Sequence, residues 1–459
     1  MKKIIIIICI IAMALLAIVL SASLQVEKTS YYDGVYYKKS IHQLDSLRKN
    51  HASIHHSLEA GFAKVSITPV LHYHEDHAAE GKFKGVALAG NYSRKGAFAT
   101  EIHDSIFVRT AAIRVADRLM IIVGSDLLLI TQNITDAVLS LLAPDGIGRD
   151  QLMLTATHTH SSLGGWGMGY FGTKLAGAYN EQISHWLASQ IAISVRMAIR
   201  DLKPALIGSG NAAAAAYIRN RLTGATGVTN DDFSYIILEQ TEGKKAIIGS
   251  FSAHSSVITA DYMAISGDYP GYWQRKMEHT FADYAIFCAG AMGSQNPDGV
   301  DGASFDLAKN LGEALAEIVT QSASATQMSD SVVFSAMTMK FHLPDFSIRI
   351  KNNISTVVQR SRNSSNGAVL QALRLNDMVW ISTPADFSGE IALQIKNYLY
   401  PKGFNANITG FNGNFLGYII PSKYYFLEHY ESRTMGWYGP NMGDYTTDMI
   451  RHLSDIVIR

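Results

Sequence analysis

The sequence LMLTATHTHS at residues 152–161 joins an apolar run to two histidines separated by a single residue. The run ending at Ala156 is typical of a buried β-strand, and the Gly-bearing stretch at 161–166 is typical of an exposed loop. Because successive side chains alternate across an extended chain, we expect His158 and His160 to leave the strand on one face. Two such imidazoles suit a metal ligand beside a proton shuttle, although two unrelated loop histidines would have the same spacing.

Outside this stretch, strand and helix patterns alternate from Gly61 onward without a Pro/Ser-rich linker. This alternation predicts an α/β fold of mixed β-sheets flanked by helices, and the length allows either one large domain or two or three average ones. The predicted strands are residues 107–115, 119–123, 152–157, 235–238, 246–251, 285–288, 332–339 and 378–381. The predicted helices are residues 41–47, 178–199, 269–279, 305–320 and 387–399.

The composition limits the class of partner. The chain has 459 residues, of which 47% are hydrophobic, enough for a sizeable core. Basic and acidic residues both number 39, so the formal net charge is zero. A protein without a basic stripe is not expected to bind nucleic acid, and it suits a small or uncharged substrate better.

The N-terminus carries a targeting pattern. Lys2 and Lys3 precede an apolar run at residues 4–20, and small residues follow. Residues 1–23 are therefore predicted to be a signal peptide that directs a secreted, periplasmic or cell-surface protein. The apolar run is long, so a membrane anchor that is not cleaved is the alternative.

The rest of the chain divides into two parts. Residues 24–60 are polar and are interpreted as a leader segment packed on the domain that follows at 61–459. The only cysteines are Cys9 and Cys288, so removal of the signal would leave no internal disulfide.

Further candidate residues follow other apolar runs. His254 begins a loop after the strand at 246–251 and is either a structural histidine or a ligand. Asp268 is expected to cap a helix that has Pro270 near its first turn. Asp386 either caps the helix at 387–399 or turns its carboxylate into a site at the strand end.

Two other groups have weaker patterns. Ser294 lacks the GxSxG frame of a serine nucleophile. His72, His74 and His77 share a loop with two acids and have the composition of a metal clip, although a solvated loop is the favoured interpretation.

Taken in order, these motifs resemble the catalytic domain of the neutral ceramidases, the zinc-dependent N-acylsphingosine amidohydrolases. The similar segments are collinear from about Gly61 to the C-terminus. They are GFAKVSITP at 61–69, EIHD at 101–104 with Arg109, SDLL at 125–128, THTHS at 157–161 with Gly164 and Gly165, Asn220-Arg221, AHSS at 253–256, PADF at 384–387, Tyr418, and Tyr430-Glu431.

The resemblance implies a metal site and a set of catalytic groups. Its zinc ligands would be His158, His254, Asp386 and Tyr418, a donor set that suits Zn²⁺. The resemblance assigns proton transfer to His160. Candidate donors to the developing oxyanion are Arg221 and Tyr430, and Asn296 would hydrogen-bond the substrate or hold the water.

The sequence departs from the family pattern in three places. Where the family has G-D-V-S-P-N, Asn296 stands at the serine position and Ser294 at the aspartate position. The metal acid is Asp386 instead of glutamate. The chain also ends where the C-terminal immunoglobulin-like domain of the family would begin.

The resemblance therefore implies a secreted zinc-dependent amidohydrolase that cleaves ceramide or a related N-acylated lipid with a metal-activated water. Its partner would be a small lipid-like substrate, with association at a membrane surface as a further expectation. The alternatives are a zinc hydrolase of a different amide or ester, and a catalytically silent binding protein on the same scaffold.

Overall fold

The structure is a computed structural model that describes residues 4–13, 23–25, 30–351, 354–357 and 367–459. Residues 1–3 and 14–22 of the predicted signal peptide lie outside the described residues. Within the described ranges, no helix is both long enough and apolar enough to cross a membrane.

The helices and strands of the domain alternate along the chain, as the sequence predicts. The main helices are α2 (Val35–Lys49), α3 (Gln132–Leu142), α4 (Gly169–Ala176), α5 (Glu181–Arg200), α6 (Asp268–Thr280), α7 (Phe305–Ser324), α8 (Gly389–Leu399) and α9 (Met442–Val457). The strands of the large sheet are β2 (Ile54–Ser66), β4 (Phe107–Val115), β5 (Arg118–Ser125), β6 (Leu152–Ala156), β7 (Lys203–Ala213), β9 (Asp232–Gln240), β10 (Lys245–Phe251), β12 (Tyr284–Ala289), β14 (Ser331–Lys340), β17 (Val369–Leu375), β18 (Met378–Ser382) and β20 (Asn405–Thr409). Short strands complete the list: β1 (Ser23–Gln25), β3 (Glu101–Ile102), β8 (Ile218–Asn220), β11 (Ala264–Ile265), β13 (Gln295–Pro297), β15 (Ser347–Lys351), β16 (Ile354–Val357), β19 (Asp386–Phe387) and β21 (Tyr418–Ile419).

Strand β2 is the branch point of the large sheet. Its first residues pair with β14, and its later residues pair with β7 on one side and β4 on the other. One branch continues through β4, β5 and β6, and another runs through β7, β9, β10 and β12. Strand β12 also packs against β4, β5 and β6, so the two branches face one another across a shared apolar layer.

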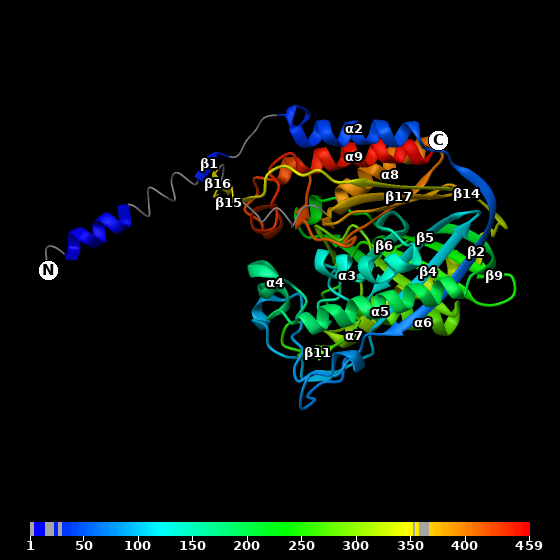
Figure 1. Cartoon of the computed structure of the whole chain (residues 1–459), viewed down its shortest axis with the longest axis horizontal. Helices are drawn as coiled ribbons and strands as arrows, with labels where there is room; N and C mark the ends of the chain where they lie inside the picture. Colours follow the sequence, from blue (N-terminus) through cyan, green and yellow to red (C-terminus); the bar gives the residue numbers. More distant parts are fainter. Residues whose placement is uncertain (1–3, 14–22, 26–29, 352–353, 358–366) are drawn as a thin grey trace.

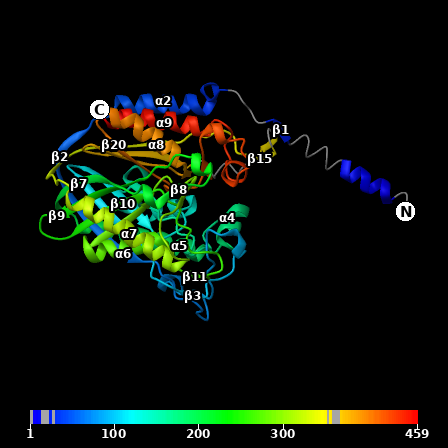
Figure 2. The ribbon, with the colours of Figure 1, turned by 180° about the vertical axis from the view of Figure 1, so that it is seen from behind.

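Helices cover the outer faces of the two branches. Helix α5 packs on β2 and β4, while α6 and α7 pack on β12 and β7. Figure 1 shows α5 in front, and Figure 2, from behind, brings α6 and α7 forward. The apolar residues of α5 recur at a helical spacing, so one face is buried and the other is exposed.

The C-terminal part of the sheet, β14-β17-β18-β20, has its own helical cover. Helices α8 and α9 pack on it, and α2 lies beside α9 in both views (Figures 1 and 2). Ser40 of α2 is hydrogen-bonded to the hydroxyl of Tyr445 in α9 at 2.7 Å. Helix α2, within the segment predicted as a leader, is therefore packed on the domain, and residues 54–60 of that segment form the start of β2.

The α/β fold class is confirmed, with corrections at the ends of elements. The helix predicted at 178–199 begins at Glu181, because the Asn180 side chain caps it by accepting a hydrogen bond from the Gln182 amide. The helix predicted at 387–399 begins at Gly389, because Phe387 belongs to β19.

Asp268 is not the N-cap that the sequence predicts. Gly267 occupies that position, and Asp268 is the first residue of α6, with a left-handed φ of 52°. Its buried carboxylate accepts hydrogen bonds from the amides of Tyr269 and Ile258, at 2.6 and 3.3 Å.

The stretch at 161–166, predicted to be an exposed loop, is buried instead. Gly164 makes this possible, because a Cβ there would lie 2.2 Å from the carbonyl oxygen of Ala176. The loop therefore lies under α4 and does not face solvent.

Within the large sheet, β5 with β6, β10 with β12, and β18 with β20 are parallel pairs. Parallel strands bring their carboxyl ends to the same edge, where ligands usually bind in α/β folds. The segments that follow β6, β10 and β18 contain His158, His254 and Asp386. The topology thus gathers three stretches that are far apart in the sequence.

Candidate metal centre

Three imidazoles meet at the carboxyl ends of these strands. The Nε2 atoms of His158 and His254 are 3.1 Å apart, and the Nε2 of His160 lies 3.3 and 3.1 Å from them. His158 and His254 are buried, and His160 is half-buried. Both predicted histidines of the THTH stretch therefore face the same point as His254.

The convergence of His158 and His160 does not come from strand alternation. Strand β6 ends at Ala156, and His158 has a left-handed φ of 61°. The sharp change in chain direction brings the two rings together, at 4.9 Å between centroids. A non-glycine residue with such a φ is often found at a functional site, where surrounding structure compensates for the strain.

Hydrogen bonds fix this turn. His158 donates from Nδ1 to the carbonyl of Leu128 at 2.8 Å, which leaves its Nε2 unprotonated and available to a metal. Ser255 donates to the carbonyl of Thr157 at 2.8 Å, and the amide of His160 donates to the carbonyl of Ser255 at 3.0 Å. The two histidine-bearing segments are thus joined through their backbones.

Asp386 and Tyr418 are placed together by a short parallel pairing. They are register partners in the β19–β21 ladder, so the backbone sets their separation. The Asp386 Oδ2 atom lies 3.7 Å from His158 Nε2. Within the described residues, neither carboxylate oxygen of Asp386 accepts a hydrogen bond. A buried carboxylate of this kind is suited to bind a cation. The sequence left two roles open for Asp386, helix cap or site residue. The structure places its side chain in the site.

Arg221 connects the other predicted site residues. Its Nη2 donates to the Tyr418 hydroxyl at 3.0 Å, and its Nη1 donates to Asn296 Oδ1 at 3.1 Å. Its Nε donates to the Glu431 carboxylate at 2.6 Å. The pairing of β8 with β13 brings Arg221 beside Asn296, because Arg219 and Asn296 are register partners.

Ser294 and Glu431 complete this network. The Ser294 hydroxyl donates to Glu431 Oε2 at 2.7 Å, and the Ser294 carbonyl accepts from the Arg221 amide at 2.8 Å. Ser294 has a left-handed φ of 71°. Its hydroxyl therefore serves a buried carboxylate, which agrees with the absence of a serine-nucleophile motif.

Tyr430 lies at the outer edge of the site. Its ring is 5.7 Å from that of Tyr418, edge to face, and the residue is exposed. The eight predicted residues thus fall in one region: His158, His160, Arg221, His254, Asn296, Asp386, Tyr418 and Tyr430.

Burial governs the protonation of the site. It lowers the pKa of His158 and His254 below the usual histidine value, and it lowers that of His160 to about 3. The imidazoles are therefore neutral at pH 7, the form that binds metals.

The pKa values of Asp386, Tyr418 and Arg221 are shifted upward, in contrast to those of the histidines. Burial raises the pKa of the Asp386 carboxyl to about 7, against the effect of Arg221. Burial also raises the pKa of the Tyr418 hydroxyl, and the nearby Asp386 carboxylate raises it further. Burial alone would lower the pKa of Arg221, but Tyr418 and Glu431 raise it above its usual value. Arg221 is thus the permanent positive charge of the site.

The spacing of the imidazoles fits a metal ion. Zinc–nitrogen bonds of about 2.0–2.1 Å in tetrahedral geometry hold two nitrogens roughly 3.3 Å apart, and the three Nε2 atoms are 3.1–3.3 Å apart. A buried carboxylate and a phenol complete a set of nitrogen and oxygen donors that suits Zn²⁺. The residues present therefore fit a zinc ion.

The sequence did not predict the role of Phe411. Its ring stacks on His158 with centroids 4.0 Å apart, and its φ is 62°. Aromatic contacts continue outward through Phe415 and Trp437 to Phe171 of α4. The signal available in the sequence is the glycine pair that flanks Phe411 and Asn412, since it marks a tight turn after a strand.

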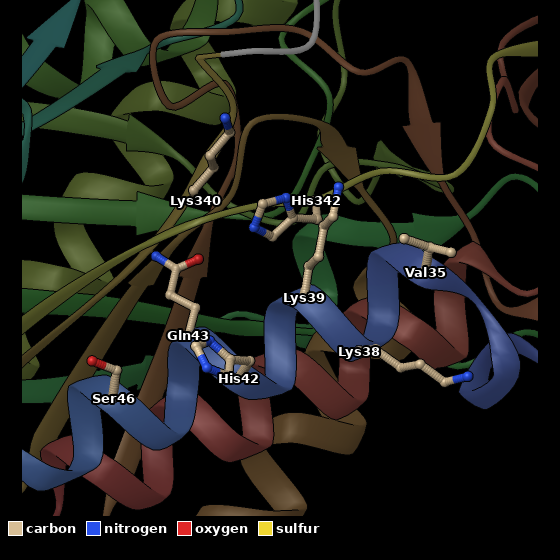
Figure 3. Close-up of a pocket in the computed structure, with 8 residues that line it drawn as sticks. All are labelled: Val35, Lys38, Lys39, His42, Gln43, Ser46, Lys340 and His342. Atoms are coloured by element: carbon tan, nitrogen blue, oxygen red, sulfur yellow. The ribbon is translucent and has the colours of Figure 1, made fainter.

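A separate groove lies on α2 beside the end of β14. Figure 3 shows Lys38, Lys39, Lys340 and His342 along it, with His42 on the same helix. It contains none of the predicted site residues and is cationic, unlike the histidine centre.

The chain is similar to known proteins in sequence and in fold. Residues 78–298 match the family model of the neutral/alkaline non-lysosomal ceramidase N-terminal domain. The neutral ceramidase of Pseudomonas aeruginosa has the same fold, with a TM-score of 0.71 at 18% identity over 87% of this chain and 74% of that one. A ceramidase solved in complex with C2 aligns with a TM-score of 0.69 at 19% identity, over 87% and 75% of the two chains. No curated protein gave a significant match. The resemblance found in the sequence is thereby confirmed, and the solved structures establish the fold.

Proposed function

We propose, from the match of residues 78–298 to the neutral/alkaline ceramidases, that the chain is a zinc-dependent hydrolase of the amide bond of ceramide or a related N-acylated lipid. The observation that carries the proposal is the meeting of three neutral imidazoles with Asp386 and Tyr418. Imidazoles and a carboxylate are the usual ligands of hydrolytic zinc sites.

The proposed metal ligands are His158, His254, Asp386 and Tyr418. Zinc bound there would polarise the amide carbonyl and lower the pKa of a water molecule toward about 7. The His158–Leu128 hydrogen bond orients one ligand, and the Arg221–Tyr418 hydrogen bond favours the ionised phenol of another.

His160 is the proposed general base and acid. Its Nε2 lies within 3.3 Å of both histidine ligands, close enough to reach a water in the centre. It would take a proton from the attacking water as the oxygen–carbon bond forms. It would then return that proton to the nitrogen as the carbon–nitrogen bond breaks, which releases a fatty acid and an amine.

Arg221, Tyr430 and Asn296 are proposed to bind the reacting carbonyl and the substrate. Arg221 brings a positive charge to the site, and Tyr430 brings a hydroxyl at its edge. The Oδ1 of Asn296 accepts from Arg221, which directs its Nδ2 donor away from that contact and leaves it for the substrate.

Residues 1–23 are proposed to be a signal peptide and residues 61–459 the hydrolase domain, which gives a secreted, periplasmic or cell-surface enzyme that meets its lipid at a membrane surface. Mass spectrometry of the mature N-terminus tests this location. Cleavage near Ser23 is expected, whereas an intact Met1 on membrane-bound protein would favour the anchor.

The decisive test is metal content combined with hydrolysis. Purified protein should hold zinc in the centre and cleave short- and long-chain ceramides, and His254→Ala should lose both properties. His279→Ala, which changes a histidine at the end of α6, is the control. Full zinc in the centre of His254→Ala would remove that residue from the ligand set.

A different amide or ester is the second candidate substrate, because Asn296 stands where the family motif has serine. A panel of N-acyl amides and esters separates the two candidates. Zinc without turnover on any member would favour a binding protein.

A further inference from the structure

Loop 72–77 has a second cluster of metal-ligating side chains, outside the histidine centre. His74, Glu75 and His77 each present a ligand atom, and these atoms lie within 4.8 Å of one another. The Glu75 carboxylate oxygen is 3.0 Å from Nε2 of His77 and 3.5 Å from Nε2 of His74. All three side chains are exposed, so an ion in solution reaches them directly.

The backbone of this loop is fixed before any ion binds. The amide of Val70 donates to Gly81 at 2.8 Å, and the amide of His77 donates to Lys82 at 2.8 Å. These bonds close the loop into a small hairpin-like unit. Holding ligands in place in advance reduces the entropy cost of binding.

Asp76 anchors the loop at its centre. One of its carboxylate oxygens accepts from the Lys84 amide at 2.7 Å, and the other accepts from the Asn180 side chain at 3.1 Å. Both oxygens are therefore used for structure, while the two neighbours of Asp76, Glu75 and His77, point their side chains outward. In this loop, the Asp76 carboxylate therefore has a structural role, and the Glu75 carboxylate is the one available as a metal ligand.

The aromatic ring of Tyr73 orders the two imidazoles. Its centroid is 4.3 Å from that of His74 and 5.4 Å from that of His77, the second contact being edge to face. His72 does not take part, because its Nε2 lies 3.2 Å from the carbonyl oxygen of Thr100.

We propose that His74, Glu75 and His77 form a surface site for a divalent transition metal ion, with zinc as the usual occupant. Two imidazoles and one carboxylate are borderline-to-hard donors, and water would fill the remaining positions. The ion would replace the hydrogen bond between Glu75 and His77 with two metal–ligand bonds. It would also strengthen the attachment of the loop to α5, through Asp76 and Asn180.

Zinc titration in a His254→Ala background tests this site apart from the histidine centre. Isothermal titration calorimetry with zinc alone should give one site per chain in this background, and none after His74→Ala or His77→Ala. His72→Ala is the matched control, since it removes a histidine of the same loop that faces Thr100, and it should keep the site. Circular dichroism confirms that the exposed substitutions leave the fold intact.

Two results would overturn the proposal. One is equal zinc binding by the His74, His77 and His72 variants, and the other is no binding in the parent when zinc is in large excess. The test does not depend on amide hydrolysis. If the proposed function fails, the difference between the His74 and His72 variants still decides this site.

Discussion

Nε of Arg221 lies 2.6 Å from a carboxylate oxygen of Glu431, a side chain with no exposed surface. Leaving one charge of a buried pair without its partner is costly, so each of these residues requires the other. The pair is also the link between Ser294, which donates to Glu431, and Tyr418, which accepts from Arg221. Glu431 is therefore a positioning residue for a candidate metal ligand.

Glu431→Gln should weaken zinc binding in the histidine centre. Groups that orient metal ligands typically contribute about 10- to 100-fold in affinity or activity. Competition with a chelator measures the affinity and does not depend on turnover. Glu239→Gln, which breaks a half-exposed pair with Lys245 on the large sheet, is the control and should have no effect. Unchanged affinity in a folded Glu431→Gln protein would limit Glu431 to structural packing.

His160→Ala should keep zinc in the centre and lose most amide hydrolysis, by about 10² to 10⁴ in rate, because it removes the proposed proton carrier. His158→Ala should lose both the zinc of the centre and hydrolysis. Elemental analysis in a His74→Ala background, where loop 72–77 should hold no zinc, and initial rates on a ceramide separate the two variants. Because all three Nε2 atoms are equally close, loss of zinc in His160→Ala would make that residue a ligand.

Ser294→Ala should lower turnover modestly, by about tenfold, which is near the low end of the cost of one hydrogen bond to a charged group. The Ser294 hydroxyl bonds to Glu431 and does not attack the substrate. Steady-state kinetics, with circular dichroism to check the fold, measure the effect. Ser294→Gly is a useful companion because glycine accepts the left-handed φ at this position. Complete loss of turnover in both variants, with zinc retained, would revive a serine mechanism.

Asp268→Asn should change the pH dependence of stability. Burial raises the pKa of Asp268 to about 7 from 3.8, with Asp104 nearby raising it further and Arg94 as the neighbouring cation. The native protein therefore holds this proton more tightly than the unfolded chain does. The stabilisation is fully present below about pH 4 and is lost as pH rises through about 7.

Urea unfolding of wild type and Asp268→Asn between pH 5 and 8 measures this effect. The stability of the wild type relative to the variant should fall as pH rises, by roughly 1.4 kcal/mol per unit of pKa difference. Asparagine keeps an acceptor and tolerates the left-handed backbone, so the comparison isolates ionisation. A difference in stability that does not vary with pH would contradict the prediction.

Elements that are set by a local sequence pattern could be predicted, and elements that depend on packing against distant parts of the chain could not. Strand β4 was predicted to the residue because its apolar run is bounded on both sides. Helix α9 was missed, since Gly443 and the adjacent Thr446 and Thr447 are weak helix formers, and packing on α2 and β17 supplies what propensity does not.

The site divides in the same way. The motif order predicted that His158, His254, Asp386 and Tyr418 would be gathered. The contact of Glu431 with Ser294 could not be predicted, because no spacing rule relates two loops that only the folded chain brings together. The same holds for Phe411, whose stacking on His158 depends on the parallel pairing of β18 with β20.

The ladder between β19 and β21 has a consequence for how the protein is made. Asp386 and Tyr418 become neighbours only when the last part of the chain has joined the sheet, yet His158 emerges from the ribosome much earlier. A nascent chain therefore has isolated histidines and no complete cage for the ion. The proposed ligand set is therefore complete only after this ladder has formed, and a chain that stops short of Tyr418 should be unable to retain zinc in the centre.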